Sequence, residues 1–320
     1  MDRRKIVLDT QVPADLLARV RSLAGDRIVV TVEESRRDPN AVRNAEVLFT
    51  QALPIDAITA NQNLRWIQTV GAGVEWLLKP AIQKRDDLIV TNARGVHAQP
   101  IAEQVFGYIL MFDRQMHVAR ARQTAGQWTR PNMAQLLTLN GKTLGVLGVG
   151  AIGQRVAEIG KAFGMKVIGL RRGSSPPTAA FEQMYKPEQL HQLLAEADFI
   201  VVALPLTAAT SGLIGEAEFK RMKKSAFLVN IGRGATIDTA AMLRALQDER
   251  IAGVGLDVTD PEPLPAEHPL WQIEDAIITP HYAGGRADYA AQVSAIFVTN
   301  LERYLDGQPL INVVDKSAGY

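Results

Sequence analysis

Residues 143–163, TLGVLGVGAIGQRVAEIGKAF, decide the fold class of the chain. A short apolar run leads into three glycines, Gly148, Gly150 and Gly153, and an amphipathic helical pattern follows from Arg155 to Phe163. In such a strand–turn–helix unit the first glycine makes a tight turn, the second lets the backbone approach a pyrophosphate, and the third permits close helix–strand packing. The stretch therefore predicts a dinucleotide-binding turn, the alternative being an ordinary strand–turn–helix connection.

Further apolar runs of strand length follow this unit and alternate with helical patterns. Including the first, they are TLGVLGV (143–149), KVIGL (166–170), FIVVAL (199–204), AFLVNI (226–231), GVGLDV (253–258) and AIITP (276–280). Six strands with intervening helices match the count of a complete dinucleotide-binding sheet. Because such alternation is typical of parallel sheets, we predict an α/β fold with a doubly wound parallel Rossmann sheet.

The chain before this block shows the same alternation on a smaller scale. Its strand-like runs are centred near Ile6, Val29, Leu48, Ile67 and Val90, and its helical stretches begin near Pro13, Asp38 and Pro54. One long helical pattern then runs from Pro100 to Gly126, and residues Trp128 to Asn140 are irregular. A last amphipathic pattern runs from Tyr289 to Leu305. Since 320 residues exceed the usual size of one hydrophobic core, we predict two domains, 1–98 with 285–320 and an inserted 99–284.

Composition excludes several classes of function. The net charge of +1 supplies no global field for nucleic acid or an anionic membrane. The absence of cysteine excludes disulfides and thiolate nucleophiles, and no clustered His, Asp or Glu pattern indicates a metal site. The N-terminal MDRRKIVLD lacks the apolar region of a secretory signal, and no apolar run approaches the length of a membrane span. We therefore expect a cytoplasmic protein.

The end of the second strand of the block indicates which dinucleotide is bound. An NAD site usually has Asp or Glu about 20 residues after the glycines, where the carboxylate binds the ribose 2′-hydroxyl. Here the strand leads instead into Arg171, Arg172, Gly173 and Ser174. Guanidinium and hydroxyl groups suit a 2′-phosphate, so NADP is favoured and NAD is possible with lower preference. A solvated basic turn is the alternative.

Three polar residues follow later strands of the same sheet, on the edge where open α/β sheets bind ligands. Arg233 lies in NIGRG, Glu262 in DVTDPEPLP and His281 in PHYAGG. Reduction of a carbonyl in an acidic substrate needs an anion anchor and a proton donor. Taken singly, the same residues are a surface charge, a solvated loop residue and a structural histidine.

In this order after the glycine turn, the three motifs resemble those of the D-isomer-specific 2-hydroxyacid dehydrogenase family. That family includes glyoxylate/hydroxypyruvate reductases, D-lactate dehydrogenases and phosphoglycerate dehydrogenases. The resemblance covers nearly the whole chain and implies a smaller flavodoxin-like α/β domain into which the Rossmann sheet is inserted. It implies hydride transfer between NADP(H) and a small 2-oxo or D-2-hydroxy acid, with His281 as acid/base, Glu262 as its partner and Arg233 binding the substrate.

The resemblance also implies further contacts. The turn of Val70, Gly71, Ala72 and Gly73 would meet the substrate carboxylate across the cleft, and glycine-flanked turns are also plausible anion-binding nests. Asp257 would meet the nicotinamide carboxamide. The other expected cofactor contacts are Ala151, Ile152, Leu204, Pro205, Thr207, Ile231, Gly232, Arg233 and His281. The helical segment from Pro100 and the stretch around Trp128 would pack across a two-fold axis, giving a homodimer.

The sequence leaves alternatives open for the cofactor, the activity and the substrate. Arg171 stands where NAD-using members have Asp, although an NAD-dependent or dual-cofactor enzyme is an alternative. Tyr282 follows His281 where a smaller residue is common, and Glu262 argues against formate oxidation, which pairs the histidine with Gln. A non-enzymatic, corepressor-like dinucleotide sensor is a rival reading of the same fold. The substrate acid does not follow from the sequence; candidates for its pocket are Met111, Trp128, Met133 and Leu136.

Overall fold

The computed structural model describes residues 4–32, 34, 41–131, 133, 136, 138–173, 179–317 and 319. The chain divides into two compact units. Unit 1 comprises Met1–Val96 with Arg286–Tyr320, and unit 2 comprises His97–Gly285. No helix in the described ranges is both long and apolar enough to cross a membrane. The assignment of substrate binding to one unit and dinucleotide binding to the other remains a prediction.

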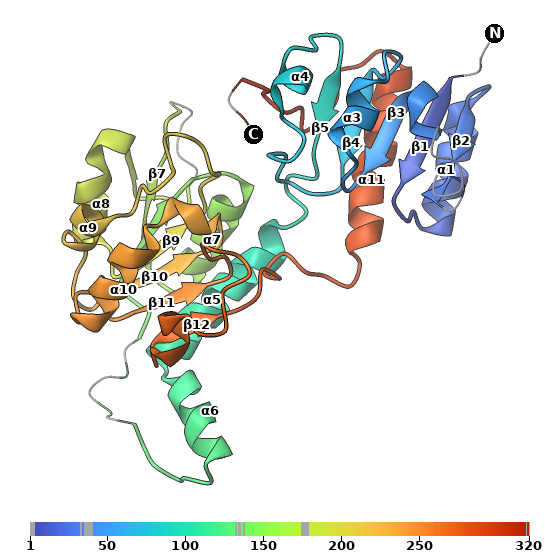
Figure 1. Ribbon diagram of the computed structural model, residues 1–320. Helices are drawn as coiled ribbons and strands as arrows, with labels where there is room; N and C mark the ends of the chain where they lie inside the picture. Colours follow the sequence, from blue (N-terminus) through green and yellow to red (C-terminus); the bar gives the residue numbers. More distant parts are fainter. Residues whose placement is uncertain are drawn as a thin grey trace. The chain divides into compact units, whose positions relative to one another are not determined.

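Unit 1 is built on a five-stranded parallel sheet in the order β2-β1-β3-β4-β5 (Figure 1). This is the flavodoxin-like order, in which the direction of winding reverses beside the first strand. The strands coincide with the five predicted runs and are β1 (Lys5–Asp9), β2 (Ile28–Val30), β3 (Ala45–Thr50), β4 (Trp66–Thr69) and β5 (Ile89–Thr91).

Helices cover both faces of this sheet. They are α1 (Ala14–Ala24), α3 (Ile55–Thr59), α4 (Pro80–Gln83) and the C-terminal α11 (Tyr289–Leu305), with a 3₁₀ turn η1 (Ala41–Asn44). α1 and α11 pack on the face that includes Phe49, whose ring stacks on Phe297 at 4.6 Å. α3 and α4 pack on the opposite face. The predicted helix starts at Pro13 and Pro54 are confirmed, whereas the one at Asp38 lies outside the described residues.

Unit 2 contains a seven-stranded parallel sheet in the order β12-β11-β10-β9-β6-β7-β8. The strands are β6 (Thr143–Leu147), β7 (Lys166–Leu170), β8 (Gln183–Tyr185), β9 (Phe199–Val202), β10 (Phe227–Asn230), β11 (Gly253–Leu256) and β12 (Ala276–Ile278). This confirms the doubly wound α/β prediction, but the sheet has seven strands where six were predicted. The missed strand β8 is a three-residue edge strand in which only Tyr185 is fully buried, so it has no apolar run to detect.

Helices pack on both faces of the larger sheet. The described helices of unit 2 are α5 (Ala98–Asp113), α6 (Met116–Thr124), α7 (Ala151–Ala162), α8 (Leu190–Glu196), α9 (Glu216–Phe219) and α10 (Thr239–Gln247), with 3₁₀ turns η3 (Pro187–Gln189), η4 (Gly234–Thr236) and η5 (Pro269–Gln272). α5 and α7 share one apolar core with the sheet, and α8 and α10 share the other. Loops follow the carboxyl ends of the strands, and α7 and η4 begin close to this edge.

The predicted single helix from Pro100 to Gly126 is wrong. The chain forms α5 and α6, separated at Arg114 and Gln115, and Gln115 has a left-handed backbone with φ of 52°. No glycine or proline stands at this break to mark it in the sequence. The hydrophobic periodicity runs across it and therefore predicted one continuous helix. α6 extends away from the sheet of unit 2 (Figure 1), and within α6 only Val118 is fully buried.

Candidate active site

The glycine turn after β6 has the geometry that its sequence predicts. Gly148 has φ of 102°, and a Cβ atom there would lie 2.6 Å from the carbonyl oxygen of Ala203. A Cβ atom at Gly153 would lie 2.1 Å from the carbonyl oxygen of Gly148, so α7 can approach β6 only without a side chain at that position. For a Cβ atom at Gly150, no atom of the described residues beyond its chain neighbours lies within 4 Å. The middle glycine therefore faces open space, as close approach of a pyrophosphate requires.

This turn also lies where the topology favours a ligand. β6 is flanked by β9 on one side and β7 on the other, so the strand order reverses beside it. Open α/β sheets bind ligands at the carboxyl edge of such a switch point. α7 begins at Ala151 with Gly150 as its N-cap, and its first amide groups have no partner within the helix. The expected contacts Ala151 and Ile152 are thus the first two residues of a helix whose positive end suits phosphate.

Three cationic residues meet at the neighbouring strand end. Arg171 is half-buried and Arg172 exposed directly after β7, and the Arg171 amide donates to the carbonyl oxygen of Tyr185 at 3.1 Å. Nζ of Lys186, directly after β8, donates to the carbonyl oxygens of Arg172 (3.5 Å) and Gly173 (3.4 Å). Sequence reasoning missed Lys186 because β8 was not recognised.

The predicted Ser174 lies outside the described residues. We call the group formed by Arg171, Arg172 and Lys186 the basic turn.

The loops after β9 and β10 contact each other at the same edge. A Cβ atom at Gly232 would lie 2.5 Å from the carbonyl oxygen of Leu204, so glycine is required for these loops to meet. The Ile231 amide donates to Val202 at 3.1 Å. The structure thus brings together the predicted contacts Leu204, Pro205 and Thr207 with Ile231 and Gly232, which line the carboxyl edge next to the glycine turn.

The predicted catalytic residues follow three consecutive strands of this edge. Nδ1 of His281 lies 2.6 Å from Oε1 of Glu262, and both side chains are about half exposed, at 50% and 42%. Glu262 follows β11 in a segment in which the Asp260–Pro261 and Glu262–Pro263 peptide bonds are cis. Arg233 follows β10, is half-buried, and donates through Nη1 to the carbonyl oxygen of Gly232 at 2.8 Å. Nδ1 contacts a carboxylate and no described residue hydrogen-bonds Nε2 of His281, so Nε2 can contact a ligand.

The backbone at His281 is held in an unusual conformation by Asp257. His281 has φ of 51°, and its amide donates to the Asp257 carbonyl oxygen at 2.8 Å. The buried Asp257 carboxylate accepts the amides of Tyr282 and Ala283, both at 3.0 Å, and the Thr279 hydroxyl at 2.6 Å. A left-handed non-glycine residue persists only where its surroundings fix it. Asp257 therefore fixes the turn that presents His281, a role that sequence reasoning did not assign to it.

A buried tyrosine extends this arrangement. The hydroxyl groups of Tyr108, in α5, and Thr279 are hydrogen-bonded, and burial raises the pKa of Tyr108 to about 12. Tyr108 therefore stays protonated at neutral pH. Tyr108 and Thr279 are far apart in the sequence, so no local sequence pattern could predict their contact.

The predicted substrate turn lies in unit 1, directly after β4. Val70 is buried, and Gly71, Ala72 and Gly73 are half-buried. Among the described residues, no acceptor binds the amide groups of these last three residues, whereas the carbonyl oxygens of Val70, Gly71 and Ala72 are all hydrogen-bonded. A run of amides directed away from the protein is the feature of an anion-binding nest.

The fold and the glycine turn are those of a dinucleotide-binding α/β protein. The family model "D-isomer specific 2-hydroxyacid dehydrogenase, NAD binding domain" matches residues 106–283. Glyoxylate reductase from Aeropyrum pernix is 36% identical over 283 residues, 86% of this chain and 84% of that protein. A D-isomer specific 2-hydroxyacid dehydrogenase family protein from Aeromonas salmonicida subsp. salmonicida superposes with a TM-score of 0.83 at 34% identity, covering 98% of this chain and 100% of that one.

A second solved structure is also similar over the full length. NADPH-dependent glyoxylate/hydroxypyruvate reductase from Sinorhizobium meliloti, in complex with NADP and sulfate, gives a TM-score of 0.84 at 25% identity, covering 99% of this chain and 100% of that one. The chain belongs to the D-isomer specific 2-hydroxyacid dehydrogenase family. It is therefore a member of an enzyme family that uses a nicotinamide dinucleotide and acts on small hydroxy or oxo acids, as its motifs predicted.

Proposed function

We propose that this chain is an NADP-dependent reductase of small 2-oxo acids that forms D-2-hydroxy acids. The observation that supports it most is the pair of His281 and Glu262, joined at 2.6 Å on the sheet edge that also presents Arg233 and the glycine turn. The relative from Aeropyrum pernix is a glyoxylate reductase, and the one from Sinorhizobium meliloti is an NADPH-dependent glyoxylate/hydroxypyruvate reductase. Both names agree with a substrate of this class.

The reaction needs three contributions from the side chains. Bound NADPH supplies the hydride that the carbonyl carbon C2 receives. Arg233 binds the substrate carboxylate and polarises the carbonyl group, which stabilises charge as it develops on the oxygen. Protonated His281 donates its Nε2 proton to that oxygen, so that C=O becomes CH–OH. Glu262 holds Nδ1, which fixes the ring orientation and directs Nε2 toward the substrate.

The remaining predicted contacts complete this proposal. The amides of Gly71, Ala72 and Gly73 bind the substrate carboxylate, and Asp257 contacts the nicotinamide carboxamide. The basic turn of Arg171, Arg172 and Lys186 binds the 2′-phosphate of NADP, with Ser174 as a further donor. Three cations without a carboxylate at the ribose position favour the phosphorylated dinucleotide over NAD.

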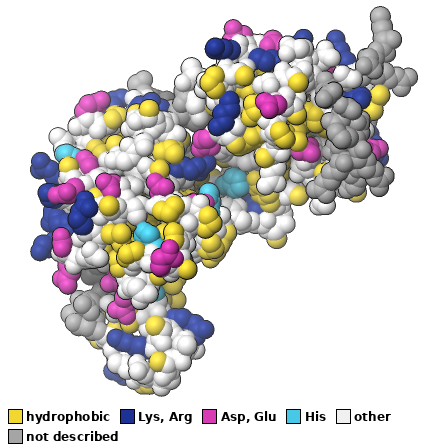
Figure 2. Space-filling view, viewed as in Figure 1, with side chains coloured by type: hydrophobic (Ala, Val, Ile, Leu, Met, Phe, Trp, Pro, Cys, Tyr) yellow, Lys and Arg dark blue, Asp and Glu magenta, His cyan; other side chains and the backbone are white. Residues whose placement is uncertain are grey.

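Assembly as a homodimer is part of the same proposal. Large apolar side chains are exposed in α6 and after it: Met116 is 54% exposed, Met133 67% and Trp128 fully exposed. On the face shown in Figure 2, acidic and basic side chains are interspersed, which agrees with the net charge of +1. Apolar side chains in such a charge-balanced surface suit a second copy of the chain.

A spectrophotometric panel tests the proposed reaction. Glyoxylate, hydroxypyruvate, pyruvate and phenylpyruvate are each offered with NADPH and with NADH, and the products are assigned by chiral chromatography. We expect oxidation of NADPH with at least one acid and a D-configured product wherever C2 becomes a stereocentre. NADPH binding without turnover of any acid would indicate the corepressor-like sensor instead. Faster turnover with NADH would leave the reaction class standing and refute the NADP preference.

A further inference from the structure

The turn at Val70–Gly73 is shaped by hydrogen bonds to its carbonyl oxygens. We propose that Tyr289, the first residue of α11, is a positioning residue whose hydroxyl group orients the amide of Gly71 toward the substrate carboxylate. The inference rests on the proposed function, because it assumes that this turn binds a 2-oxo acid.

The physical link between the two groups is the planar peptide unit. The carbonyl oxygen of one residue and the amide of the next belong to the same rigid plane and point in opposite directions. A hydrogen bond that fixes the carbonyl oxygen of Val70 therefore also fixes the direction of the Gly71 N–H. The same relation joins the Gly71 oxygen to the Ala72 amide and the Ala72 oxygen to the Gly73 amide.

All three of these carbonyl oxygens are held from the protein side. The Val70 oxygen accepts the Tyr289 hydroxyl. The Gly71 oxygen accepts the Thr69 hydroxyl at 2.9 Å and the Ala93 amide at 3.1 Å. The Ala72 oxygen accepts Nδ2 of Asn92 at 2.8 Å.

Three consecutive peptide planes are thus fixed at their oxygen ends, while their N–H ends have no acceptor within the described residues. A ligand carboxylate then meets donors that need no reorganisation on binding.

The space beside Gly71 agrees with ligand binding at this turn. A Cβ atom at Gly71 would have the carbonyl oxygen of Gly73, at 3.8 Å, as its nearest neighbour, so the space beside Gly71 is open. The glycine at this position therefore leaves room for a ligand as well as forming the turn.

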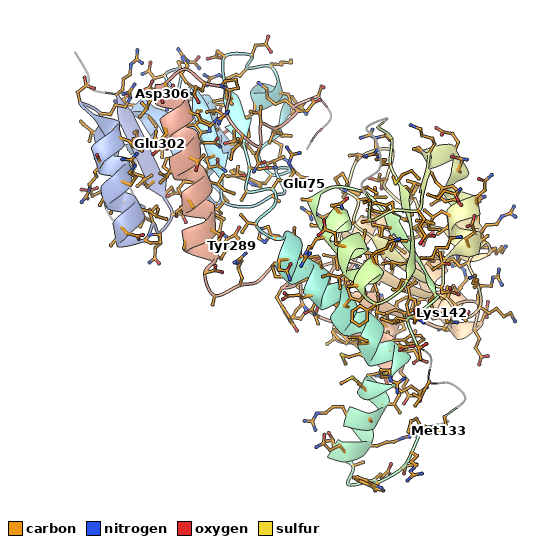
Figure 3. All side chains as sticks on the ribbon, turned by 180° about the vertical axis from the view of Figure 1, so that it is seen from behind. Glu75, Met133, Lys142, Tyr289, Glu302 and Asp306 are labelled. Carbon is orange, nitrogen blue, oxygen red and sulfur yellow. The ribbon has the colours of Figure 1, made fainter. Side chains whose placement is uncertain are left out.

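Tyr289 is well placed to act as a fixed donor. It stands at the start of α11 (Figure 3), whose Phe297 and Leu301 are fully buried against the sheet. Burial also raises the pKa of Tyr289, so its hydroxyl stays protonated across the neutral range. Of the three carbonyl oxygens, that of Val70 is held by a side chain far away in sequence, 219 residues along the chain. Tyr289 thereby makes the turn depend on the docking of the C-terminal helix.

The variant Tyr289→Phe tests the proposal, because it removes one oxygen atom and keeps the ring. We expect the KM for the preferred 2-oxo acid to rise roughly 3- to 10-fold, the range for loss of one hydrogen bond, with kcat within about 2-fold of wild type. The KM for NADPH should not change. Thr69→Val should raise the substrate KM by a smaller factor, because the Ala93 amide still holds the Gly71 oxygen.

Tyr304→Phe is the matched control. Tyr304 lies on the same helix, and its hydroxyl donates to Glu46 at 3.0 Å rather than to the turn. It should lower stability by as much as Tyr289→Phe while leaving the substrate KM unchanged. Equal KM changes in the two tyrosine variants, or none in Tyr289→Phe, would overturn the positioning role.

A binding measurement separates this proposal from the proposed function. Oxalate carries the carboxylate that the turn would bind but cannot be reduced in this way, so its Kd is measured by calorimetry with the NADPH-loaded protein. The Kd should rise in Tyr289→Phe and stay constant in Tyr304→Phe. Absence of turnover in wild type would refute the proposed function alone. An oxalate Kd that is the same in wild type and Tyr289→Phe would refute the positioning role alone.

Discussion

Two histidine–glutamate pairs in unit 2 have similar geometry, but their surroundings give them different expected roles. His281 and Glu262 are 2.6 Å apart at the carboxyl edge of the sheet, and His191 and Glu218 are 2.8 Å apart on α8 and α9. Both pairs are partly exposed, so neither is expected to add much to stability. Only the first pair lies beside Arg233 on the strand ends where the sheet binds ligands.

The two pairs give the first prediction a matched control. His281→Ala should lower kcat for 2-oxo acid reduction by about 10²- to 10⁴-fold, because it removes the proton donor. The NADPH Kd, measured by fluorescence, should change by a much smaller factor than kcat, because the other predicted dinucleotide contacts remain. His191→Ala removes a histidine from the same kind of ion pair and should keep wild-type kcat. Wild-type turnover by His281→Ala would rule out the proposed proton transfer.

The basic turn leads to a second prediction at the residue scale. Arg171 follows β7 where a carboxylate would bind the ribose hydroxyl of NAD, so Arg171→Asp both repels the 2′-phosphate and supplies that acceptor. Charged hydrogen bonds contribute roughly 1.5–3 kcal/mol each, so the preference for NADPH in kcat/KM should fall by at least about 10-fold and invert toward NADH. The measurement is kcat/KM for both dinucleotides.

Lys186→Gln should weaken NADPH use by a smaller factor, because its ammonium group is exposed and shares the phosphate with two arginines. Lys161→Gln is the control, since Lys161 pairs with Glu182 at 3.3 Å. A wild-type preference for NADH would leave the basic turn as a solvated loop.

At the scale of elements, sequence patterns predicted most of both sheets but not their irregular parts. Eleven strands were found because each lies in a compact apolar run bounded by turn residues, and the glycine turn because its three positions are local. The edge strand β8 and the break between α5 and α6 were missed, since neither changes the hydrophobic pattern. Contacts such as Tyr108 with Thr279 or Tyr289 with Val70 join distant segments, so only the folded chain reveals them.

The break after α5 creates a contact whose strength depends on pH. His117 on α6 contacts Oδ1 of Asp275 through Nε2 at 3.1 Å and the Met111 carbonyl oxygen through Nδ1 at 3.0 Å. The hydrogen bond with Asp275 is the main cause that raises the pKa of His117 above its ordinary value, and desolvation opposes it. A histidine with a raised pKa in the folded state stabilises that state most when it is protonated.

This gives the third prediction. The stabilisation by His117 should be fully present below its unfolded pKa of about 6.5 and should disappear as the pH rises through the higher folded value. The difference in urea midpoint between wild type and His117→Asn should therefore be larger near pH 5.5 than near pH 8.5. Because Asp275 is 45% exposed, we expect no more than about 1 kcal/mol. His191→Asn serves as the exposed control, and an equal difference at both pH values would contradict the prediction.

At the scale of the whole molecule, the exposed apolar side chains of unit 2 lead to a prediction of self-association. Trp128 is fully exposed, and Met133, labelled in Figure 3, is 67% exposed on the same segment. Tryptophan is among the residues that contribute most to protein interfaces when buried. Burial of these side chains against a second copy would form the apolar centre of an interface.

The last prediction is therefore a homodimer held together by this segment. Sedimentation equilibrium at micromolar concentration should give twice the 34.9 kDa of one chain. The double variant Trp128→Ser with Met133→Ser should shift the equilibrium toward the monomer, because a stable interface buries about 800 Å² per partner and depends on its few large apolar residues.

Trp271→Ser is the matched control, since Trp271 is 47% exposed but donates through Nε1 to the carbonyl oxygen of Pro265 at 2.8 Å within its own chain. It should stay dimeric. A wild-type chain that sediments as a monomer would show that Trp128 and Met133 are exposed for another reason. Dissociation of the Trp271 variant but not of the double variant would instead place the interface at η5.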